Sequence, residues 1–340
     1  MNSADVLVSL EITGWNGPFD EAVQARAMAA LEEGKVLFLP HLPFVVGLEE
    51  QRFLTPDVAA GDRKNVSFDH ASGHLGGCAL TGADGVALAA MIDRFGRQAT
   101  SLVSGLAPRY APHLERARTS YRPVEVKGRA QTLRHDDRLL HVDAFPTRPM
   151  RGRRILRLFS NIAPDGSPRE WRVGQPFADY AARFLPNVKA PLPGAAFMLK
   201  TLGLTKGTRS AYDSIMLGLH DQGKYDRDWQ QNSPHAAVDF PTGSTWMCFP
   251  DAALHAALEQ LGVALGTLAQ TVPHVPQLLM SLPVLTHSGP QHLKPQLLPQ
   301  VGPAPAPEPL APLAPAPAFP VPLVPLPPRP ALPPCAGSPP

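Results

Sequence analysis

The composition of the chain changes abruptly near residue 290, and this change limits how much of the chain can fold. Residues 290–340 hold 20 of the 41 prolines and only three charged residues. Proline fixes its own backbone angle and has no N–H to donate, so this segment cannot form a helix or a sheet strand. It favours an extended, polyproline-like chain that need not pack on anything. We therefore predict a folded domain over residues 1–289 and a disordered proline-rich tail over 290–340.

The composition of the whole chain excludes several classes of protein. A hydrophobic fraction of 44% in 340 residues is ample for a core, and a formal net charge of +2 is too small for a protein that coats nucleic acid. Cys78, Cys248 and Cys335 are spaced too widely for a disulfide framework or a zinc ribbon. The first residues lack the pattern of a signal peptide, and no run approaches the roughly 20 apolar residues of a membrane span. We expect a cytosolic protein with no transmembrane segment and no nucleic-acid partner.

Two stretches have the apolar spacing of helices, and several short runs have the pattern of strands. Residues 18–36 place Asp20 and Glu21 in an opening turn and Gly34 at the stop, and residues 84–108 repeat every three to four positions. Residues 35–46 indicate a buried strand. Serial short strands favour an antiparallel sandwich or barrel. We predict them within residues 118–128, 138–145, 154–166, 214–224 and 236–249.

The triplet His141-Val-Asp143 is the strongest chemical motif. Residues two apart in a strand point to the same face, so the imidazole and the carboxylate can reach one metal ion. A second histidine would complete the 2-His-1-carboxylate face that leaves Fe(II) three open positions. His255, after a glycine turn at Gly243 and a strand, is the preferred third ligand, and His220 and His235 are competitors. Zinc hydrolysis with the same ligand types also remains open.

The strand after this triplet carries a candidate anion-binding residue. Arg157, Phe159 and Asn161 share one face, and a buried arginine needs an anion. A small keto acid would satisfy Arg157 through its carboxylate, with Asn161 as a neighbouring donor. The alternatives are that Arg157 lies at the surface or pairs with an aspartate.

Several longer segments resemble a known family. They are "GKVLFLPHLPF", "RKNVSFD", "RHDDRLLHVDAFPTRPMRGRRILRLFSNIAPDGSPREWRVGQPF", "LHDQGKYDRDWQ" and "DFPTGSTWMCFPDAALHAAL". Together, over residues 15–258, they are similar to the Kdo hydroxylases, which are Fe(II)/2-oxoglutarate dioxygenases of Gram-negative bacteria. These enzymes hydroxylate C3 of Kdo (3-deoxy-D-manno-oct-2-ulosonic acid) in the lipid A inner core, which gives the sugar acid Ko.

The resemblance implies a fold, a metal and a substrate. The fold would be α+β, mainly β, as a double-stranded β-helix (jelly roll) with flanking helices. His141, Asp143 and His255 would hold Fe(II), and 2-oxoglutarate and O2 would be the co-substrates. The anionic substrate, Kdo-containing lipid A, suggests a peripheral contact with the cytoplasmic face of the inner membrane. The arginines of the turn-rich segment after Asp143 would guide this substrate at the site mouth, namely Arg148, Arg151, Arg153 and Arg154.

Other functions and one anomaly complete the expectations. A related oxygenase could act on another sugar, small acid or protein, and the proline tail could make the chain an interaction scaffold. Many enzymes of this superfamily bind the co-substrate with a basic residue about ten positions after the last histidine, but none follows His255 until Lys294, so Arg157 is the expected substitute. We also expect that much of residues 259–340 departs from the family's reading frame, which would impair this copy. A native disordered linker is the alternative.

Overall fold

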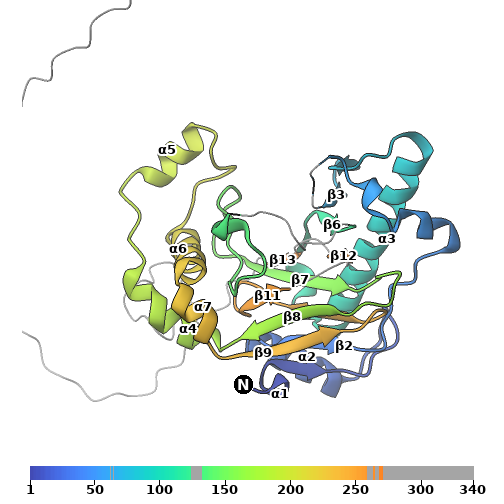
Figure 1. Ribbon diagram of the computed structural model, residues 1–340, viewed down its shortest axis with the longest axis horizontal. Coiled ribbons are helices and arrows are strands. Elements are labelled where there is room, and N and C mark those ends of the chain that lie inside the picture. The colour runs from blue at the N-terminus through green and yellow to red at the C-terminus, as the bar shows by residue number, and fades with distance from the viewer. Residues whose placement is uncertain (62, 64, 124–131, 259–262, 265–267, 271–340) are drawn as a thin grey trace, which may run out of the picture. The chain divides into compact units, whose positions relative to one another are not determined.

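The computed structural model describes residues 1–61, 63, 65–123, 132–258, 263–264 and 268–270 (Figure 1). The described elements belong to one unit within Met1–His287 and form a mixed α/β fold with three sheets. Helical elements lie between groups of strands along the chain. They are α1 (Ser3–Val6), α2 (Glu21–Glu32), η1 (Leu48–Phe53), η2 (Pro56–Val58), α3 (Gly82–Leu106), η3 (Ala111–His113), η4 (Leu133–His135), α4 (Phe177–Phe184), η5 (Leu185–Asn187), α5 (Ala195–Thr201), α6 (Ala211–Tyr225) and α7 (Arg227–Asn232).

The main sheet has the order β1-β2-β10-β7-β13-β5, with β12 also paired to β7. Its first pair is parallel, and the other pairs are antiparallel. Its strands are β1 (Leu7–Ser9), β2 (Val36–Leu39), β5 (Leu114–Arg116), β7 (Arg154–Ser160), β10 (Thr245–Cys248), β12 (Val263–Ala264) and β13 (Leu268–Gln270).

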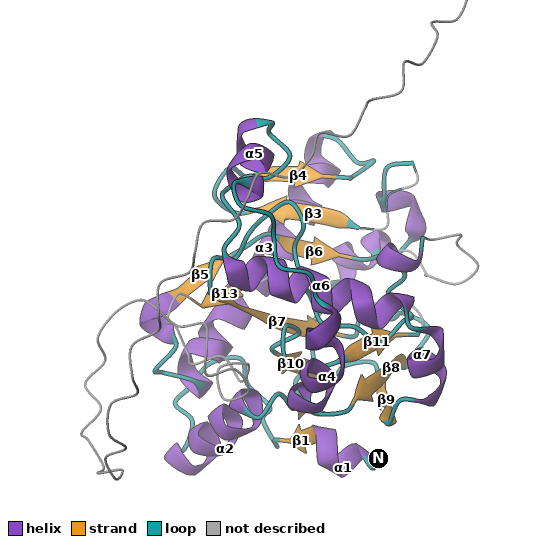
Figure 2. Cartoon of the chain, turned by 90° about the vertical axis from the view of Figure 1, so that its left-hand side faces the viewer, coloured by secondary structure: helices purple, strands orange, loops and turns teal. Residues whose placement is uncertain are grey.

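Two smaller sheets complete the set. The order in the second sheet is β11-β8-β9, and that in the third is β4-β3-β6. Figure 2 shows β3, β4 and β6 side by side as a separate small sheet. The strands are β3 (Val66–Asp69), β4 (His74–Gly76), β6 (Thr119–Tyr121), β8 (Arg169–Gly174), β9 (His235–Phe240) and β11 (His255–Ala257).

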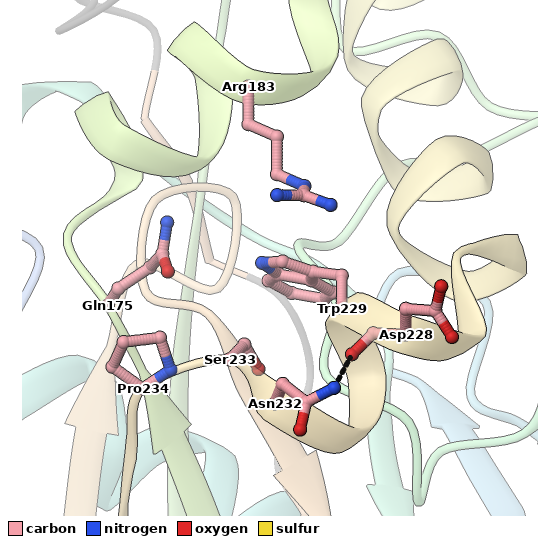
Figure 3. Close-up of a pocket in the computed structure, with 7 residues that line it drawn as sticks. All are labelled: Gln175, Arg183, Asp228, Trp229, Asn232, Ser233 and Pro234. Atoms are coloured by element: carbon pink, nitrogen blue, oxygen red, sulfur yellow. Dashed lines mark hydrogen bonds between the residues drawn. The ribbon is translucent and has the colours of Figure 1, made fainter.

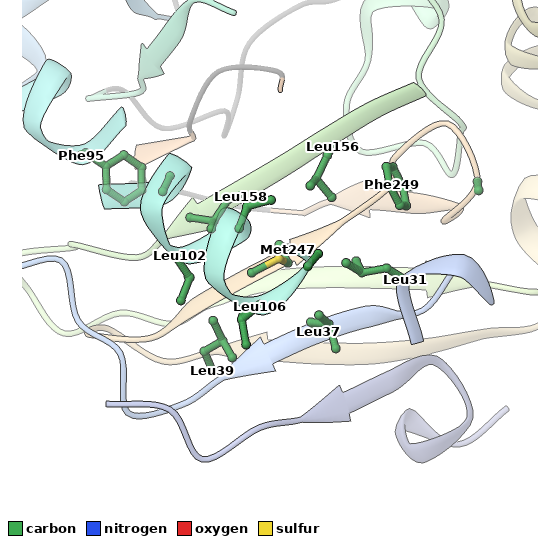
Figure 4. Close-up of a cluster of buried hydrophobic side chains, with 14 of the residues drawn as sticks. Leu31, Leu37, Leu39, Phe95, Leu102, Leu106, Leu156, Leu158, Met247 and Phe249 are labelled. Carbon is green, nitrogen blue, oxygen red and sulfur yellow. The ribbon is translucent and has the colours of Figure 1, made fainter. Parts of the chain in front are cut away.

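The two long helices expected near the N-terminus are present. α2 begins after Asp20, which takes the N-cap position, and ends before Gly34, whose φ of 75° is unfavourable for a residue with a Cβ. α3 buries one face, because its apolar residues recur every three or four positions. In Figure 4, Leu102 and Leu106 of this helix lie beside Leu158 of β7 and other leucines of the main sheet. This packing covers one face of the main sheet and fixes the direction of β7.

The other face of the main sheet is also buried, against a cluster rich in aromatic rings. Phe240 and Trp246 are stacked at a centroid distance of 4.1 Å and an interplanar angle of 3°, and Phe159 stacks on Trp246 at 5.4 Å. Trp171 of β8 meets Phe159 edge to face. These rings join strands of the main sheet to strands of the second sheet. Cover on both faces explains why all the residues of 154–160 except Arg157 are buried, instead of every second one.

Two of the expected strands are wrong. Residues 214–224 lie in α6, where a capping box between Ser210 and Asp213 starts a helix that outweighs the short apolar run. Residues 138–145 form no regular strand, and their sheet-like contact is an isolated bridge between His141 and His255. Residues 118–128 contain β6 only over Thr119–Tyr121, and 124–128 lie outside the described residues.

The sheet continues beyond residue 258. β12 and β13 both pair with β7, and β13 also pairs with β5. The main sheet therefore has strands after His255 among the described residues. The predicted tail over residues 290–340 lies outside the described residues, and the reading-frame expectation remains a prediction. No helix among the described residues is long and apolar enough to cross a membrane.

Arg154, expected on a substrate-facing loop, is instead a buried residue of β7. Its guanidinium lies 3.2 Å from an Asp251 carboxylate oxygen and 3.5 Å from one of Glu32, and it covers the Phe249 ring at 3.9 Å. Asp251 also accepts a hydrogen bond from the backbone of Ile155. A desolvated cation needs this fixed counter-charge, so Arg154 ties β7 to α2 and to the turn that precedes β11.

We predict that Arg154→Met lowers the free energy of unfolding by about 3–5 kcal/mol, because Asp251 keeps a buried, unpaired charge. The double variant Arg154→Met with Asp251→Leu should recover most of the loss. Arg148→Met, at an exposed position, is the matched control and should change stability by less than about 0.5 kcal/mol. Urea unfolding followed by tryptophan fluorescence measures all three. If Arg154→Met unfolded at the same urea concentration as the wild type, the structural role of Arg154 would be excluded, and Arg154 would again be a candidate for the substrate site.

Candidate metal centre

Backbone pairing brings the two histidines together from distant parts of the chain. The N–H of His141 donates to the carbonyl of His255 and the N–H of His255 donates to that of His141, each at 3.0 Å. β11 is in turn held by β8, with Val173 opposite His255. The two imidazole rings therefore lie side by side, with centroids 4.6 Å apart.

Asp143 completes a cluster of three ligand atoms. Its backbone N–H donates to the carbonyl of Pro250 at 2.7 Å, which fixes the chain two residues after His141. One carboxylate oxygen lies 3.7 Å from Nε2 of His141. Ligand atoms of His141, Asp143 and His255 all lie within 4.8 Å of one another, and all three residues are buried. Two imidazoles and one carboxylate at a single point match the 2-His-1-carboxylate face.

Both imidazoles are held in the form that binds metals. Nδ1 of His141 lies 2.7 Å from the carbonyl of Leu139, and Nδ1 of His255 lies 2.9 Å from that of Ala253. A backbone carbonyl only accepts, so each Nδ1 donates its proton and each Nε2 keeps a free lone pair. Burial lowers the pKa of His141 well below its usual value and also lowers the pKa of His255. Both rings are therefore neutral at physiological pH, as metal ligation requires.

Arg157 contacts the carboxylate ligand directly. Its guanidinium lies 3.0 Å from Oδ2 of Asp143, which leaves Oδ1 toward His141. Cys248 of β10 lies opposite Arg157 in the strand register. Burial raises the pKa of the Cys248 thiol, so the thiol remains protonated. Of the readings left open for Arg157, pairing with an aspartate is the one seen. A guanidinium has five N–H donors, so this ion pair does not use its full capacity.

β8 contributes two residues that the sequence reading missed. The indole of Trp171 stacks on His255, with centroids 5.3 Å apart and an interplanar angle of 26°. Arg169 lies two residues earlier on the same face and is 7% exposed. Its Nη1 has no hydrogen-bond partner among the described residues. The alternating burial of β8 was the available signal, because every second side chain from Arg169 to Val173 is buried.

Comparison with known proteins identifies the family. A family model described as 3-deoxy-D-manno-oct-2-ulosonic acid (Kdo) hydroxylase matches residues 15–282. The chain belongs to the Kdo hydroxylase family. The match runs beyond residue 258, where the resemblance was expected to fade. Among curated proteins the comparison finds no match.

Solved Kdo hydroxylase structures are similar to this member of the family over most of their length. The complex with cobalt(II) has a TM-score of 0.75 and 44% identity, and covers 78% of this chain and 89% of that chain. The complex with α-ketoglutarate and Fe(III) has the same TM-score and coverage, with 43% identity. The complex with succinate and Fe(III) has a TM-score of 0.74 and 42% identity, with 78% and 88% covered. These structures are described as non-heme Fe(II) α-ketoglutarate-dependent dioxygenases.

The two competing histidines do not join the cluster in this Kdo hydroxylase. The ring of His220 lies edge to face with that of His141 at 5.7 Å, but its Nδ1 is engaged by Asp221 at 2.8 Å. His220 is on α6 rather than on a strand. His235, on β9, has its Nδ1 2.9 Å from the carbonyl of Ser233. The structure thus places His255, and neither competitor, with His141 and Asp143.

The expected arginine cluster is divided. Arg148 and Arg151 are exposed on the turn after Asp143, whereas Arg153 forms an ion pair with Glu115. Arg151 has a φ of 55°, and its backbone N–H donates to the carboxylate of Asp213 at 3.1 Å. That carboxylate thus fixes the turn while the two exposed guanidinium groups remain at the surface.

Asn161 does not serve as a donor toward a co-substrate. Its amide nitrogen donates to the carbonyls of Ser167 and Phe240, at 2.9 and 3.0 Å, and its oxygen accepts from Ala163. Both N–H groups are used, so the expected role is wrong. Asn161 instead closes the turn between β7 and β8.

A separate pocket lies beside α4 and α7. Its volume is about 440 Å³, and Arg183 and Trp229 face each other across it (Figure 3). The rest of its lining comes from α7 and from the segments next to α4 and α7, and it includes none of His141, Asp143 and His255; the residues are Gln175, Asp228, Asn232, Ser233 and Pro234. The metal cluster is therefore independent of this pocket.

We predict that His141→Ala, Asp143→Ala and His255→Ala each weaken Co(II) binding by at least about 100-fold, because two protein ligands remain. His135→Ala and His220→Ala are the matched controls and should keep the metal. Titration followed by visible absorption measures the affinity. If His220→Ala lost the metal while His255→Ala kept it, the third ligand would have been assigned wrongly.

Proposed function

We propose that this protein is an Fe(II)- and 2-oxoglutarate-dependent dioxygenase that hydroxylates C3 of Kdo in the lipid A inner core to give Ko. The observation that carries the proposal is the buried cluster of His141, Asp143 and His255 in a chain that belongs to the Kdo hydroxylase family. A lone His-x-Asp pair is common, but three converging ligands with neutral, oriented imidazoles are not expected by chance.

The donor set fits Fe(II) better than it fits a structural zinc ion. One carboxylate and two imidazoles leave open positions on an octahedral ion, and no thiolate is available from the buried, protonated Cys248. Bound iron would supply the oxidation, in which one oxygen atom of O2 enters the C–H bond and the other enters succinate as 2-oxoglutarate loses CO2. The protein orients the ligands: Arg157 holds Asp143, and two carbonyls hold the histidines.

The arrangement of the main sheet and the second sheet supports a double-stranded β-helix. The main and second sheets enclose the aromatic cluster of Phe159, Trp171, Phe240 and Trp246. The bridge between His141 and His255 lies at the edge of the second sheet and adjoins this interior. A jelly roll positions a metal in this way, at one end of a packed interior.

Two arginines are suited to the co-substrate carboxylates. Arg157 contacts the metal ligand Asp143, and Arg169 carries a buried Nη1 with no hydrogen-bond partner among the described residues. Burial lowers the pKa of Arg169 to about 9, so a bound carboxylate would relieve the cost of keeping it charged. Trp171, two residues after Arg169 on β8 and stacked on His255, would form an apolar wall beside the carbon chain of the keto acid.

Arg148 and Arg151 remain candidates for the anionic substrate. Both are exposed on the turn that begins a few positions after Asp143 in the sequence. A sugar carboxylate or a lipid phosphate could reach them there. Arg153 and Arg154 are already paired with Glu115 and Asp251 and are less suited to this role. A substrate in a lipid bilayer implies that the protein works as a peripheral protein at the cytoplasmic face of the inner membrane.

We predict that Arg157→Lys raises the apparent KM for 2-oxoglutarate by about tenfold and that for the sugar much less. Lys replaces a planar fork by a point charge and cannot hold Asp143 and a carboxylate in the same geometry. Arg148→Lys is the matched control. Co(II) titration of the same variant separates a co-substrate defect from loss of metal. An unchanged KM for 2-oxoglutarate would exclude Arg157 from this role.

We predict that the protein, supplied with Fe(II) and ascorbate, forms succinate when a Kdo-containing lipid A precursor is added. Mass spectrometry should find one added oxygen atom on Kdo and none with a His141→Ala control. Succinate formation without oxygen on Kdo would indicate a different acceptor. Iron-loaded protein that oxidises neither would contradict the proposal.

A further inference from the structure

Exposed large hydrophobic side chains gather in one short segment. Among the described residues, five of the eleven such side chains lie between residues 192 and 204. Their exposed fractions run from 57% to 77%, for Leu192, Phe197, Met198, Leu202 and Leu204. Single exposed apolar residues are ordinary on a protein surface, but a cluster of this density marks a contact with another surface.

The same segment is purely cationic. Residues 187–210, which we call the α5 segment, contain four basic residues and no Asp or Glu, whereas the whole chain is nearly balanced, with 31 Lys and Arg against 29 Asp and Glu. The basic residues are Lys189, Lys200, Lys206 and Arg209. The combination of exposed apolar side chains with positive charge alone is typical of segments that lie in the interface of an anionic bilayer.

The α5 segment is attached to the chain beside the metal centre. The N–H of Lys206 donates to the carbonyl of Thr147 at 2.8 Å, and the guanidinium of Arg209 donates to the carbonyl of Pro146. These carbonyls lie three and four residues after Asp143. At the other end, Val188 packs so closely on α6 that a Cβ at Gly218 would lie 2.5 Å from it. α5 itself projects away from the sheets (Figure 1).

We infer that the α5 segment is an interfacial anchor that inserts its apolar side chains into the headgroup region of an anionic lipid bilayer. A bilayer fits better than a protein partner, because all the charges of the segment have one sign and its five large apolar side chains are each more than half exposed. The inference rests on the proposed function in one respect: a lipid-linked sugar would then lie beside the 146–151 turn and the metal centre. Thr147, bonded to the anchor, links the two sites.

Vesicle flotation of the full-length protein tests the anchor. The wild type should bind vesicles of phosphatidylcholine with 30% phosphatidylglycerol far better than phosphatidylcholine alone in about 0.1 M NaCl. Phe197→Ser with Leu202→Ser should lower the partition coefficient at least tenfold. Leu48→Ser with Val86→Ser is the matched control, because those side chains are 84% and 72% exposed elsewhere, and it should bind like the wild type.

The charge component has its own pair of variants. Lys200→Gln with Lys206→Gln should reduce binding to the anionic vesicles about 25-fold, from about fivefold per charge, and leave binding to phosphatidylcholine unchanged. Arg26→Gln with Arg109→Gln, at exposed positions elsewhere, is the control and should have no effect. Circular dichroism of each variant verifies that it is folded.

The outcomes separate this inference from the proposed function, because flotation needs neither iron, nor 2-oxoglutarate, nor a Kdo lipid. Failure to hydroxylate Kdo would leave the vesicle result unaffected. The anchor would be overturned if the wild-type protein did not bind anionic vesicles. It would also be overturned if the Phe197→Ser with Leu202→Ser variant bound them like the wild type. A wild-type dimer that becomes a monomer in the Phe197 and Leu202 variant, without vesicle binding, would assign the segment to self-association and overturn it as well.

Discussion

The metal centre depends on one pair of backbone hydrogen bonds, those exchanged between His141 and His255. The two residues are separated by more than a hundred positions and belong to no common regular strand pair. Their reciprocal bonds fix the distance between the imidazoles, and the carbonyls of Leu139 and Ala253 then fix the direction of each Nε2. A shift of register by one residue at this bridge would turn a ligand away from the metal.

The bridge is held in place by β8, which pairs with β11 and buries every second side chain from Arg169 to Val173. α3 packs on one face of the main sheet, and the aromatic cluster fills the other. Trp171 joins this packing to the chemistry, since the same ring contacts Phe159 within the aromatic cluster and stacks on His255. Close-packed side chains leave little room for either ring to turn, so ligand geometry is fixed before a metal binds.

The arginines illustrate how burial decides the role of a charged residue. Arg154 and Arg157 are on the same strand, and both have carboxylate partners inside the protein. One partner, Asp251, connects elements of the fold, whereas the other, Asp143, belongs to the candidate metal cluster with His141 and His255. Arg148 and Arg151 have the same chemistry but remain in water, so they are available for an anion from outside. In the sequence the five arginines between residues 148 and 157 look alike. Their roles differ because desolvation and ion pairing depend on the fold.

The sequence by itself determined the two long helices, the strands around Arg157 and Trp246, and the pair of residues in His-x-Asp, because these depend on spacing over a few residues. It did not determine that residues 214–224 are helical, since the short apolar run looked like a strand until the capping box was taken into account. It preferred His255 over His220 and His235 but could not exclude them, and it could neither assign Asn161 to a turn nor find Arg169 and Trp171. Those outcomes were decided by the tertiary structure alone, because each depends on which residues from remote strands share a buried face, and local spacing carries no information on that pairing.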